Sequence, residues 1–399
     1  MGNNKHFIPE NEMERLLALS ELDLDYTNLN DQFADLTELA AKVTGTDISL
    51  INLLDTFTQW SISTHGIAVE QTPRENTVCQ QTIMSDQPFE IPDLGADEQW
   101  RNNDMVTALG LKYYYGLPLQ LEKGINIGTL CVLDHDLKRL SPEKVELLKI
   151  IAQTVVKRLK SLRQMELMQN RINRSDDIKK KVAHDIRGPI SGIIGLSEIM
   201  ATQDPYCSED MSMCISMINK SGKSLLELAD EILSDDEVRT PREDEFTLNL
   251  FKDKLVRLYS PQAAYKNIAL NVTIDTAHAA IIFSKNKLIQ IAGNMVSNAI
   301  KFTPVKGTID VWLAIERVQE NQMLRIEVKD SGIGMEPEQI DIILAGKAAT
   351  TSGTFGEKGY GFGLNLVLSL VQKLNGILTI NSIPNAGTTF TVLLPQPKS

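Results

Sequence analysis

The stretch NMVSNAIKFTP, residues 294–304, decides how the C-terminal part of the chain folds and what it could bind. It is predicted to be helical, and it places Asn294, Asn298 and Lys301 at positions i, i+4 and i+7, which share one helix face. Two amide oxygens and a cation on one face suit magnesium and a polyphosphate, because magnesium prefers oxygen ligands shared with phosphates. Considered alone, a solvated helix face explains the stretch better.

A predicted strand that ends in a carboxylate and two glycines comes next. The stretch EVKDSGIGM, residues 327–335, contains Asp330, Gly332 and Gly334. A carboxylate at a strand end can accept hydrogen bonds from the exocyclic amine of a base, and glycines let a flat base approach the backbone. Tight turns use the same residues, so this pattern alone is weak.

Three alternate glycines then precede an apolar helix. The stretch EKGYGFGLNLVLSLVQKL, residues 357–374, contains Gly359, Gly361 and Gly363. Backbone N–H groups at a helix N-terminus can cradle a phosphate. This pattern is also weak alone, but the order of all three patterns within residues 294–363 is much more specific.

In this order the three patterns resemble the ATP-binding domain of histidine kinases, the Bergerat fold shared with gyrase-type ATPases. The resemblance implies ATP and Mg²⁺ as cofactors, with Asp330 reading adenine, Asn298 holding Mg²⁺ and Lys301 contacting phosphate. It also implies a mobile lid at residues 349–359, from which Lys358 would reach the γ-phosphate. The remaining implied nucleotide-binding residues are Asn294, Gly332, Gly334, Gly359, Gly361 and Gly363.

The chain departs from this family around the lid. The Phe-rich stretch that usually precedes the lid reads ILAGKAATT here, with no phenylalanine before Phe355. Phe362 also stands where a smaller or aliphatic residue is common. Both differences concern the motion of the lid more than nucleotide binding.

Of the five histidines, only His184 has neighbours that suggest chemistry; it lies in KKKVAHDIRGPISGIIG, residues 179–195. Asp185 follows it and can accept a proton from the imidazole, which leaves the other ring nitrogen free to attack phosphorus. Pro189 lies within the helical pattern, and its ring clashes with the carbonyl four residues earlier, so we expect a bend just after His184. A proline-kinked helix with an incidental histidine is the alternative.

This segment closely resembles the H box in the dimerisation domain of histidine kinases. The resemblance implies that His184 accepts the phosphoryl group, with Asp185 as general base and Arg187 as a supporting cation. Members of the family often dephosphorylate their partner, with a Thr or Asn holding a water where this chain has Gly188. Since Gly188 has no side chain, we predict weak or absent phosphatase activity.

The N-terminal part predicts a helix, several strands and another helix. The predicted strands are DISLINLLD (47–55), WSISTHG (60–66), LKYYYGLPLQ (111–120) and NIGTLCVLD (126–134), separated by Gly, Pro, Asp and Asn. This region resembles a GAF domain in the stretches DISLINLLD, TPRENTVCQQTI (72–83), FEIPDLGADEQWRNNDMV (89–106), YYYGLPLQ (113–120) and NIGTLCVLD.

A long helix and a helical hairpin are predicted to connect the two ends. The long helix begins at a Ser-Pro-Glu start signal at Ser141, and its length and polar face suit a dimeric connector. Two helical stretches broken near Pro205 predict an antiparallel hairpin. We therefore predict a multidomain α+β protein. Its units are a GAF sensor domain with connecting helix at 1–165, a dimerisation and phosphotransfer hairpin at 166–238 that forms a four-helix bundle in a homodimer, and an ATP-binding domain at 239–399.

The predicted sensor domain does not reveal its ligand, although an unknown small molecule is possible. Cys79 is followed by Gln80, without the Cys-His pair of many bilin-binding GAF domains, and a buried structural cysteine is the better interpretation. A set of mostly aromatic residues with one arginine and one cysteine could line a pocket, but such residues in a strand-rich core more often serve packing. This set is Trp60, Arg74, Cys79 and Tyr113–Tyr115.

Bulk composition limits where in the cell the protein is expected and which partners it is expected to bind. The formal charge of −12 opposes binding to nucleic acid or to an anionic membrane surface. The four cysteines form no CxxC pair and fit reduced thiols. The N-terminus resembles no secretory signal, and no apolar run is long enough to span a bilayer. We expect a cytoplasmic protein.

These observations favour a sensor histidine kinase that uses Mg²⁺-ATP to phosphorylate His184 and passes the phosphoryl group to an aspartate on a separate response regulator receiver domain. One alternative is a gyrase- or chaperone-like ATPase that transfers no phosphoryl group to protein. Another is a degenerate kinase that acts only as a binding module. Loss of acid-labile label in His184→Gln separates the first from the second, and nucleotide binding separates it from the third.

Overall fold

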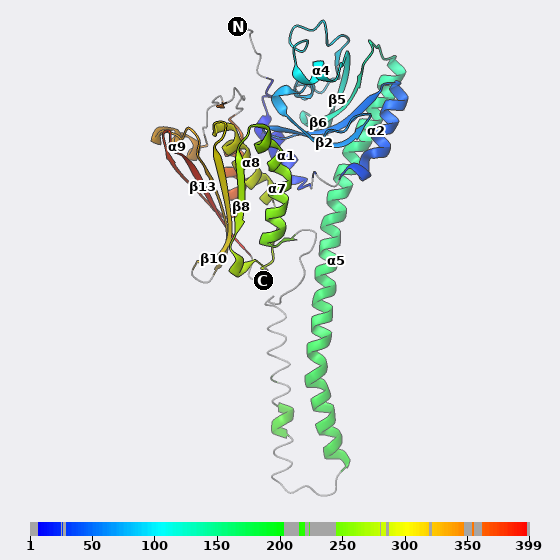
Figure 1. Ribbon diagram of the computed structural model, residues 1–399. Coiled ribbons are helices and arrows are strands. Elements are labelled where there is room, and N and C mark those ends of the chain that lie inside the picture. Colours follow the sequence, from blue (N-terminus) through cyan, green and yellow to red (C-terminus); the bar gives the residue numbers. More distant parts are fainter. Residues whose placement is uncertain are drawn as a thin grey trace.

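A computed structural model describes most of the chain as two α/β units and one long helix (Figure 1). The described residues are 7–24, 26, 29–202, 215–219, 223, 245–279, 281–284, 287–318, 321–346, 353–354 and 361–396. Over most of 170–202 only the helical backbone is described. None of the helices in this part of the chain combines the length and apolar character that crossing a bilayer requires.

The N-terminal unit is a six-stranded antiparallel sheet with the order β3-β2-β1-β6-β5-β4. The strands are β1 (Ile48–Leu54), β2 (Thr58–His65), β3 (Gln71–Pro73), β4 (Phe89–Ile91), β5 (Tyr113–Glu122) and β6 (Ile125–Asp134). The helices are α1 (Glu12–Glu21), α2 (Asn30–Thr44), α3 (Cys79–Thr82), α4 (Asp104–Ala108) and the short η1 (Arg74–Asn76). Every residue of β1 and β6 is buried, because these central strands are covered on both faces.

Two apolar clusters fill the two faces of this sheet. One cluster lies under α1, α2 and the start of α5 and includes Phe33, Ile51 and Tyr113. The other lies beneath α3 and α4 and includes Leu54 and Trp100. The predicted antiparallel GAF architecture is therefore confirmed.

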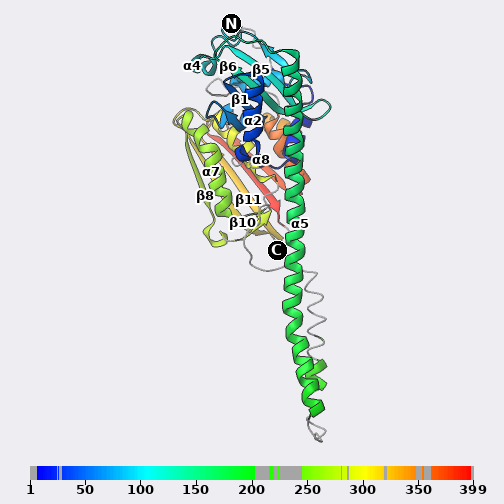
Figure 2. The same cartoon turned by 90° about the vertical axis from the view of Figure 1, so that its right-hand side faces the viewer.

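The connecting helix, α5 (Pro142–Thr202), begins as predicted, since the backbone N–H of Lys144 donates to the hydroxyl of Ser141. Its first turns bury Leu148, Val155 and Leu159 against the N-terminal sheet. The helix then continues away from both sheets (Figures 1 and 2). It passes through His184 and Pro189 without interruption, so Pro189 does not end it.

The second helix of the predicted hairpin lies mostly outside the described residues. Residues 215–219 are helical, and little else between 203 and 244 is described. The hairpin, the four-helix bundle and the reduced state of Cys207 and Cys214 therefore stay predictions.

The C-terminal unit is a five-stranded mixed sheet with the order β12-β13-β11-β10-β8. The strands are β8 (Ala269–Ile274), β10 (Thr308–Val318), β11 (Asn321–Asp330), β12 (Ile377–Ile383) and β13 (Gly387–Pro395), with a small sheet of β7 (Glu245–Phe246) and β9 (Phe283–Ser284). The helices are α7 (Leu248–Tyr265), α8 (Leu288–Phe302), α9 (Pro337–Leu344), α10 (Gly363–Lys373) and the short η2 (Thr276–His278).

Helices cover one face of this second sheet and leave the other more open. Along β10, Ile309, Val311 and Leu313 are buried, whereas Trp312 points to the opposite face and is 40% exposed. This period of two is typical of a sheet with one packed face. The α/β-sandwich arrangement predicted for a Bergerat domain is confirmed.

Candidate nucleotide site

A cleft of about 220 Å³ opens between α8, the turn after β11, α9 and the start of α10. Six of the predicted nucleotide residues line it: Asn298, Lys301, Asp330, Gly334, Gly361 and Gly363. Asn294 and Gly332 lie directly behind this lining, whereas Lys358 and Gly359 lie outside the described residues. The fold thus brings together the described members of all three sequence patterns.

Asp330 is held at the end of β11 by two backbone donors. Its Oδ1 accepts from the N–H of Gly332 at 2.7 Å and from the N–H of Thr388 at 3.2 Å. Burial raises the pKa of this carboxyl, and the two backbone hydrogen bonds oppose that rise. Since both bonds reach Oδ1, the second oxygen is available to accept a hydrogen bond from a ligand in the cleft.

Gly334 needs to be a glycine. Its φ is +64°, and a Cβ there would lie 2.0 Å from the carbonyl oxygen of Ile383. Any side chain at this position would therefore clash with the backbone, and only glycine fits the turn. The predicted close approach of a flat base to this backbone is compatible with that geometry.

The two asparagines of α8 are buried rather than solvated. Asn294 is 3% exposed and Asn298 is 6% exposed, because α7 and α10 pack on α8. Nδ2 of Asn294 donates to the carbonyl of Gln290 at 2.8 Å. Within the described part of the chain, Oδ1 of Asn294 and Nδ2 of Asn298 have no hydrogen-bond partner. The alternative of a solvated helix face is therefore wrong.

Buried polar atoms without partners are costly, which is why each one requires an explanation. Here they lie at or just behind a cleft whose other lining includes the N-terminus of α10. Oxygen and amide groups of this kind suit a phosphate and a magnesium ion bound together. The donor set therefore fits Mg²⁺-nucleotide.

Lys301 closes the same end of the cleft. Its Nζ lies 4.5 Å from the ring centroid of Phe302 and 6.0 Å from that of Phe57. Its carbonyl accepts from the backbone N–H of Thr354, a residue of the predicted lid, at 3.1 Å. Thr354 of the predicted lid is thus hydrogen-bonded to the end of α8.

His184 and Asp185 lie on α5, where only the backbone is described. The last described contact of α5 with the N-terminal unit is Arg163 with Asp23, at 3.7 Å. From Arg163 to His184 the helix extends roughly 30 Å, at 1.5 Å per residue. The predicted phosphoacceptor is therefore far along the helix from the N-terminal unit.

The possible GAF pocket residues do not converge on one cavity among the residues described. Trp60 stacks on Tyr26 at a centroid distance of 5.3 Å, on the α1 side of the sheet. Cys79 lies on the opposite side, 3.9 Å from the sulfur of Cys131 and 3.4 Å from the hydroxyl of Tyr114. The core-packing interpretation of these residues is supported.

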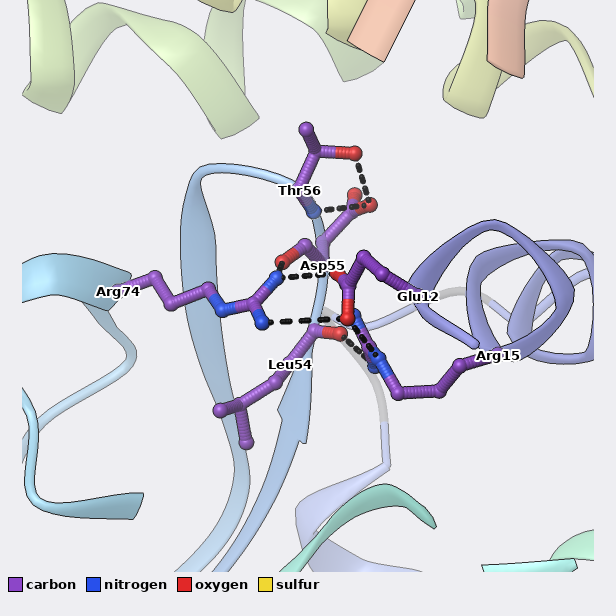
Figure 3. Close-up of polar contacts among 6 residues, drawn as sticks. All are labelled: Glu12, Arg15, Leu54, Asp55, Thr56 and Arg74. Carbon is purple, nitrogen blue, oxygen red and sulfur yellow. Dashed lines mark hydrogen bonds and ion pairs between the residues drawn. The ribbon is translucent and has the colours of Figure 1, made fainter. Parts of the chain in front are cut away.

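Arg74 instead belongs to a buried ion network that sequence patterns did not indicate (Figure 3). Its guanidinium and that of Arg15 both contact the Glu12 carboxylate, with Arg15 Nη2 at 2.7 Å. Burial raises the pKa of Glu12, but the two arginines outweigh it and hold the value at about 2. Both arginines also donate to the end of β1, Arg15 to the carbonyl of Leu54 and Arg74 to that of Asp55.

The fold and the cleft define an ATPase domain of the kind found in gyrases and histidine kinases. Residues 284–398 match the family described as histidine kinase-, DNA gyrase B-, and HSP90-like ATPase, and residues 28–159 match the GAF domain family. These matches lie within the predicted ATP-binding and sensor units.

Parts of the chain are also similar to curated sensor proteins. The chain is 31% identical over 229 residues to the autoinducer 2 sensor kinase/phosphatase LuxQ of Vibrio harveyi, covering 55% of this chain and 26% of LuxQ. It is 29% identical over 224 residues to the aerobic respiration control sensor protein ArcB of Escherichia coli, covering 54% of this chain and 28% of ArcB. The structure of full-length ShkA with AMPPNP aligns at 21% identity and a TM-score of 0.33, over 56% of this chain and 46% of ShkA, which is too low for its domain arrangement to be transferred.

The chain thus contains a GAF domain and an ATPase domain of the histidine kinase-, DNA gyrase B-, and HSP90-like family. The alignments cover only about a quarter of the length of the two curated relatives.

Proposed function

We propose that this chain binds Mg²⁺-ATP in the cleft of its C-terminal domain, phosphorylates its own His184 and transfers the phosphoryl group to an aspartate on a separate receiver domain. The observation that carries the proposal is the convergence of Asn298, Lys301, Asp330 and the glycine turns on one cleft. Three separate stretches of sequence predict the same residues as a nucleotide site.

Each part of the cleft has a proposed role. The free oxygen of Asp330 accepts from the adenine amine, and Gly334 lets the base approach the backbone. The backbone N–H groups at the start of α10 and the Lys301 ammonium bind phosphate oxygens. Asn298 holds Mg²⁺, which when bound neutralises charge on the phosphates.

His184 and Asp185 carry the proposed transfer. Asp185 accepts a proton from one ring nitrogen, and the other nitrogen attacks the γ-phosphorus as ADP leaves. The acceptor aspartate then takes the phosphoryl group. Because Gly188 has no side chain to hold a water, weak phosphatase activity stays our prediction, whereas the name of the LuxQ relative includes both kinase and phosphatase.

The test is incubation of the full chain with γ-labelled ATP. We expect acid-labile label on wild type and none on His184→Gln, since the amide cannot accept the phosphoryl group. His278→Gln is the matched control, because His278 is exposed and paired with Asp275 at 2.6 Å. Undiminished ATP hydrolysis without labelled protein would instead support a gyrase-like ATPase.

The partners follow from the same proposal. We propose a homodimer joined through the 166–238 hairpin, a response regulator receiver as acceptor, and a small GAF ligand of unknown identity. A need for ATP places the proposed activity in the cytoplasm.

A further inference from the structure

The N-terminal and C-terminal domains contact each other through a specific set of polar groups. Nε2 of Gln262, on α7, donates to Thr58 Oγ1 at 3.2 Å and to Gln71 Oε1 at 2.9 Å. Nζ of Lys287, at the start of α8, contacts Glu21 at 2.6 Å, and its backbone N–H donates to Asp23 at 3.2 Å. These contacts link the strands β2 and β3 and the end of α1 to the nucleotide domain.

Apolar groups fill the same interface. Trp60 of β2 meets Tyr259 of α7 edge-to-face, with centroids 6.3 Å apart. Both rings are buried and belong to one apolar cluster that runs through both domains. Burial and the nearby Asp55 carboxylate raise the pKa of Tyr259, so its hydroxyl stays neutral in the interface.

Phe57, in the turn between β1 and β2, enters the nucleotide cleft from the sensor domain. It lines the cleft together with Asn298, Lys301 and Gly361. Its Cε2 atom lies so close to the start of α10 that a Cβ added to Gly363 would approach it to 2.9 Å. The ring therefore occupies the end of the cleft where the phosphates of a nucleotide would be cradled.

An aromatic ring is a poor partner for this end of the cleft. Asn294 Oδ1 and Asn298 Nδ2 have no hydrogen-bond partner within the described part of the chain. The Phe57 ring thus excludes water from the two asparagine amides but offers them no hydrogen bonds in place of those that water would make. A nucleotide would satisfy these groups, so the docked ring and the phosphates compete for one place.

Backbone hydrogen bonds within the sensor domain fix the turn that carries Phe57. The backbone N–H of Arg74 donates to the carbonyl of Phe57, and that of Asp55 donates to the carbonyl of Thr58, both at 2.9 Å. Arg74 is itself fixed by Glu12, in the network that also holds the end of β1 (Figure 3). The position of Phe57 is therefore coupled to the core of the sensor domain.

The geometry points to an autoinhibited state in which the GAF domain docks on the ATP-binding domain and Phe57 blocks the phosphate end of its cleft. This inference rests on the proposed kinase function. Docking also holds the cleft beside the sensor domain, while His184 lies roughly 30 Å farther along α5 than the last GAF contact. Activation then requires release of the ATP-binding domain, which frees the cleft and lets it approach the histidine.

The first test measures Mg²⁺-ATP affinity of the full chain by displacement of a fluorescent ATP analogue. Phe57→Ala should raise the affinity at least about fivefold, a typical size for coupling between two sites. Phe89→Ala is the matched control, because Phe89 is also a half-buried GAF phenylalanine, but it packs on Tyr114 at the far edge of the sheet. Equal affinities for Phe57→Ala and wild type would overturn the inference.

A second test needs no change inside the cleft. Glu21→Lys and Lys287→Glu should each weaken docking and raise ATP affinity. The double variant should return part of the way toward the wild-type value, because the pair with position 287 is restored with its charges exchanged, whereas Lys373, 3.5 Å from Glu21, would still face a lysine. This cycle keeps the inference testable if Phe57→Ala fails to fold. Additive effects, with no restoration in the double variant, would count against a docked state.

The two proposals fail in different ways. If Phe57→Ala binds ATP like wild type and both label His184, the autoinhibited state is wrong and the kinase stands. If Phe57→Ala binds ATP more tightly but neither protein labels His184, the docked state is supported and the kinase is wrong. If no variant binds ATP, both are wrong.

Discussion

A buried ion network in the GAF domain and the buried amides of the nucleotide cleft differ in how they are bonded. In the GAF domain, Glu12, Arg15 and Arg74 are almost fully buried and bonded to one another. In the ATP-binding domain, the buried Asn294 and Asn298 leave one polar atom each without a described partner. Paired buried charges stabilise a fold, whereas unsatisfied groups at a cleft indicate that a ligand completes the structure. Substitutions in the two places should therefore have different consequences.

The largest expected effect comes from breaking the buried ion network. Glu12→Gln removes the carboxylate and leaves two buried guanidinium groups without their counter-charge, so the free energy of unfolding should fall by about 3–5 kcal/mol. Thermal and urea unfolding of the full chain would measure it. Glu14→Gln is the control, because Glu14 lies on the same helix but is exposed. A Glu12→Gln protein as stable as this control would refute a structural role for the network.

Acid should weaken the same network. The folded-state pKa of Glu12 is about 2, below its usual 4.5, so the carboxylate stabilises the fold above pH 4.5 and this contribution disappears as pH falls toward 2. The loss is about 3 kcal/mol at most, because each tenfold change in the protonation equilibrium corresponds to about 1.4 kcal/mol. The difference in unfolding free energy between wild type and Glu12→Gln should shrink across this range. A difference independent of pH would argue against an ionised Glu12.

Asp330→Asn should separate binding from stability. The amide cannot accept the proposed hydrogen bond in the same way, and we expect ATP affinity to fall about 30- to 100-fold, as for a lost charged hydrogen bond. Stability should be kept, because burial already disfavours the charged carboxylate and raises its pKa. Asp310→Asn, on the exposed side of β10, should change neither property. A large loss of stability in Asp330→Asn would make Asp330 a structural residue.

Asn298→Ala should also change the stability of the fold little. Removing a buried amide that lacks a partner for Nδ2 should change the free energy of unfolding by less than about 1 kcal/mol. Mg²⁺-ATP binding should nevertheless weaken at least about tenfold. Thermal unfolding with and without Mg²⁺-ATP would show both, since the nucleotide should raise the melting temperature of the variant less than that of wild type. Clear destabilisation without nucleotide would weaken the contrast between the domains.

The convergence of the predicted residues on one cleft follows from patterns that are local. The spacing of Asn294, Asn298 and Lys301 follows from the helix period, and the glycines after Asp330 are adjacent in sequence. Burial of the two asparagines was not predictable from that spacing, since it depends on α7 and α10 packing on α8. The sheet-and-helix pattern of the GAF domain was likewise visible from its alternating strands.

The contacts that join distant segments had no sequence signal. The sequence suggests Arg74 only as a possible pocket residue, because its partner Glu12 is 62 positions away in another element. Phe57 lies in an ordinary turn, and only the docking of two domains places it at Gly363. Such contacts depend on the complementarity of whole surfaces, which no local period encodes.

The unbroken helix α5 has a mechanical consequence. Its helical backbone is continuous from the buried Leu148 and Leu159 to His184. A rotation of the helix about its axis at the N-terminal domain is therefore transmitted to the position of His184. One turn takes 3.6 residues, so inserting seven residues after Gln169 would turn His184 by only about 20° from its original azimuth, whereas inserting two would turn it by about 160°. The length of this helix thus sets the direction in which the histidine faces as firmly as its sequence does.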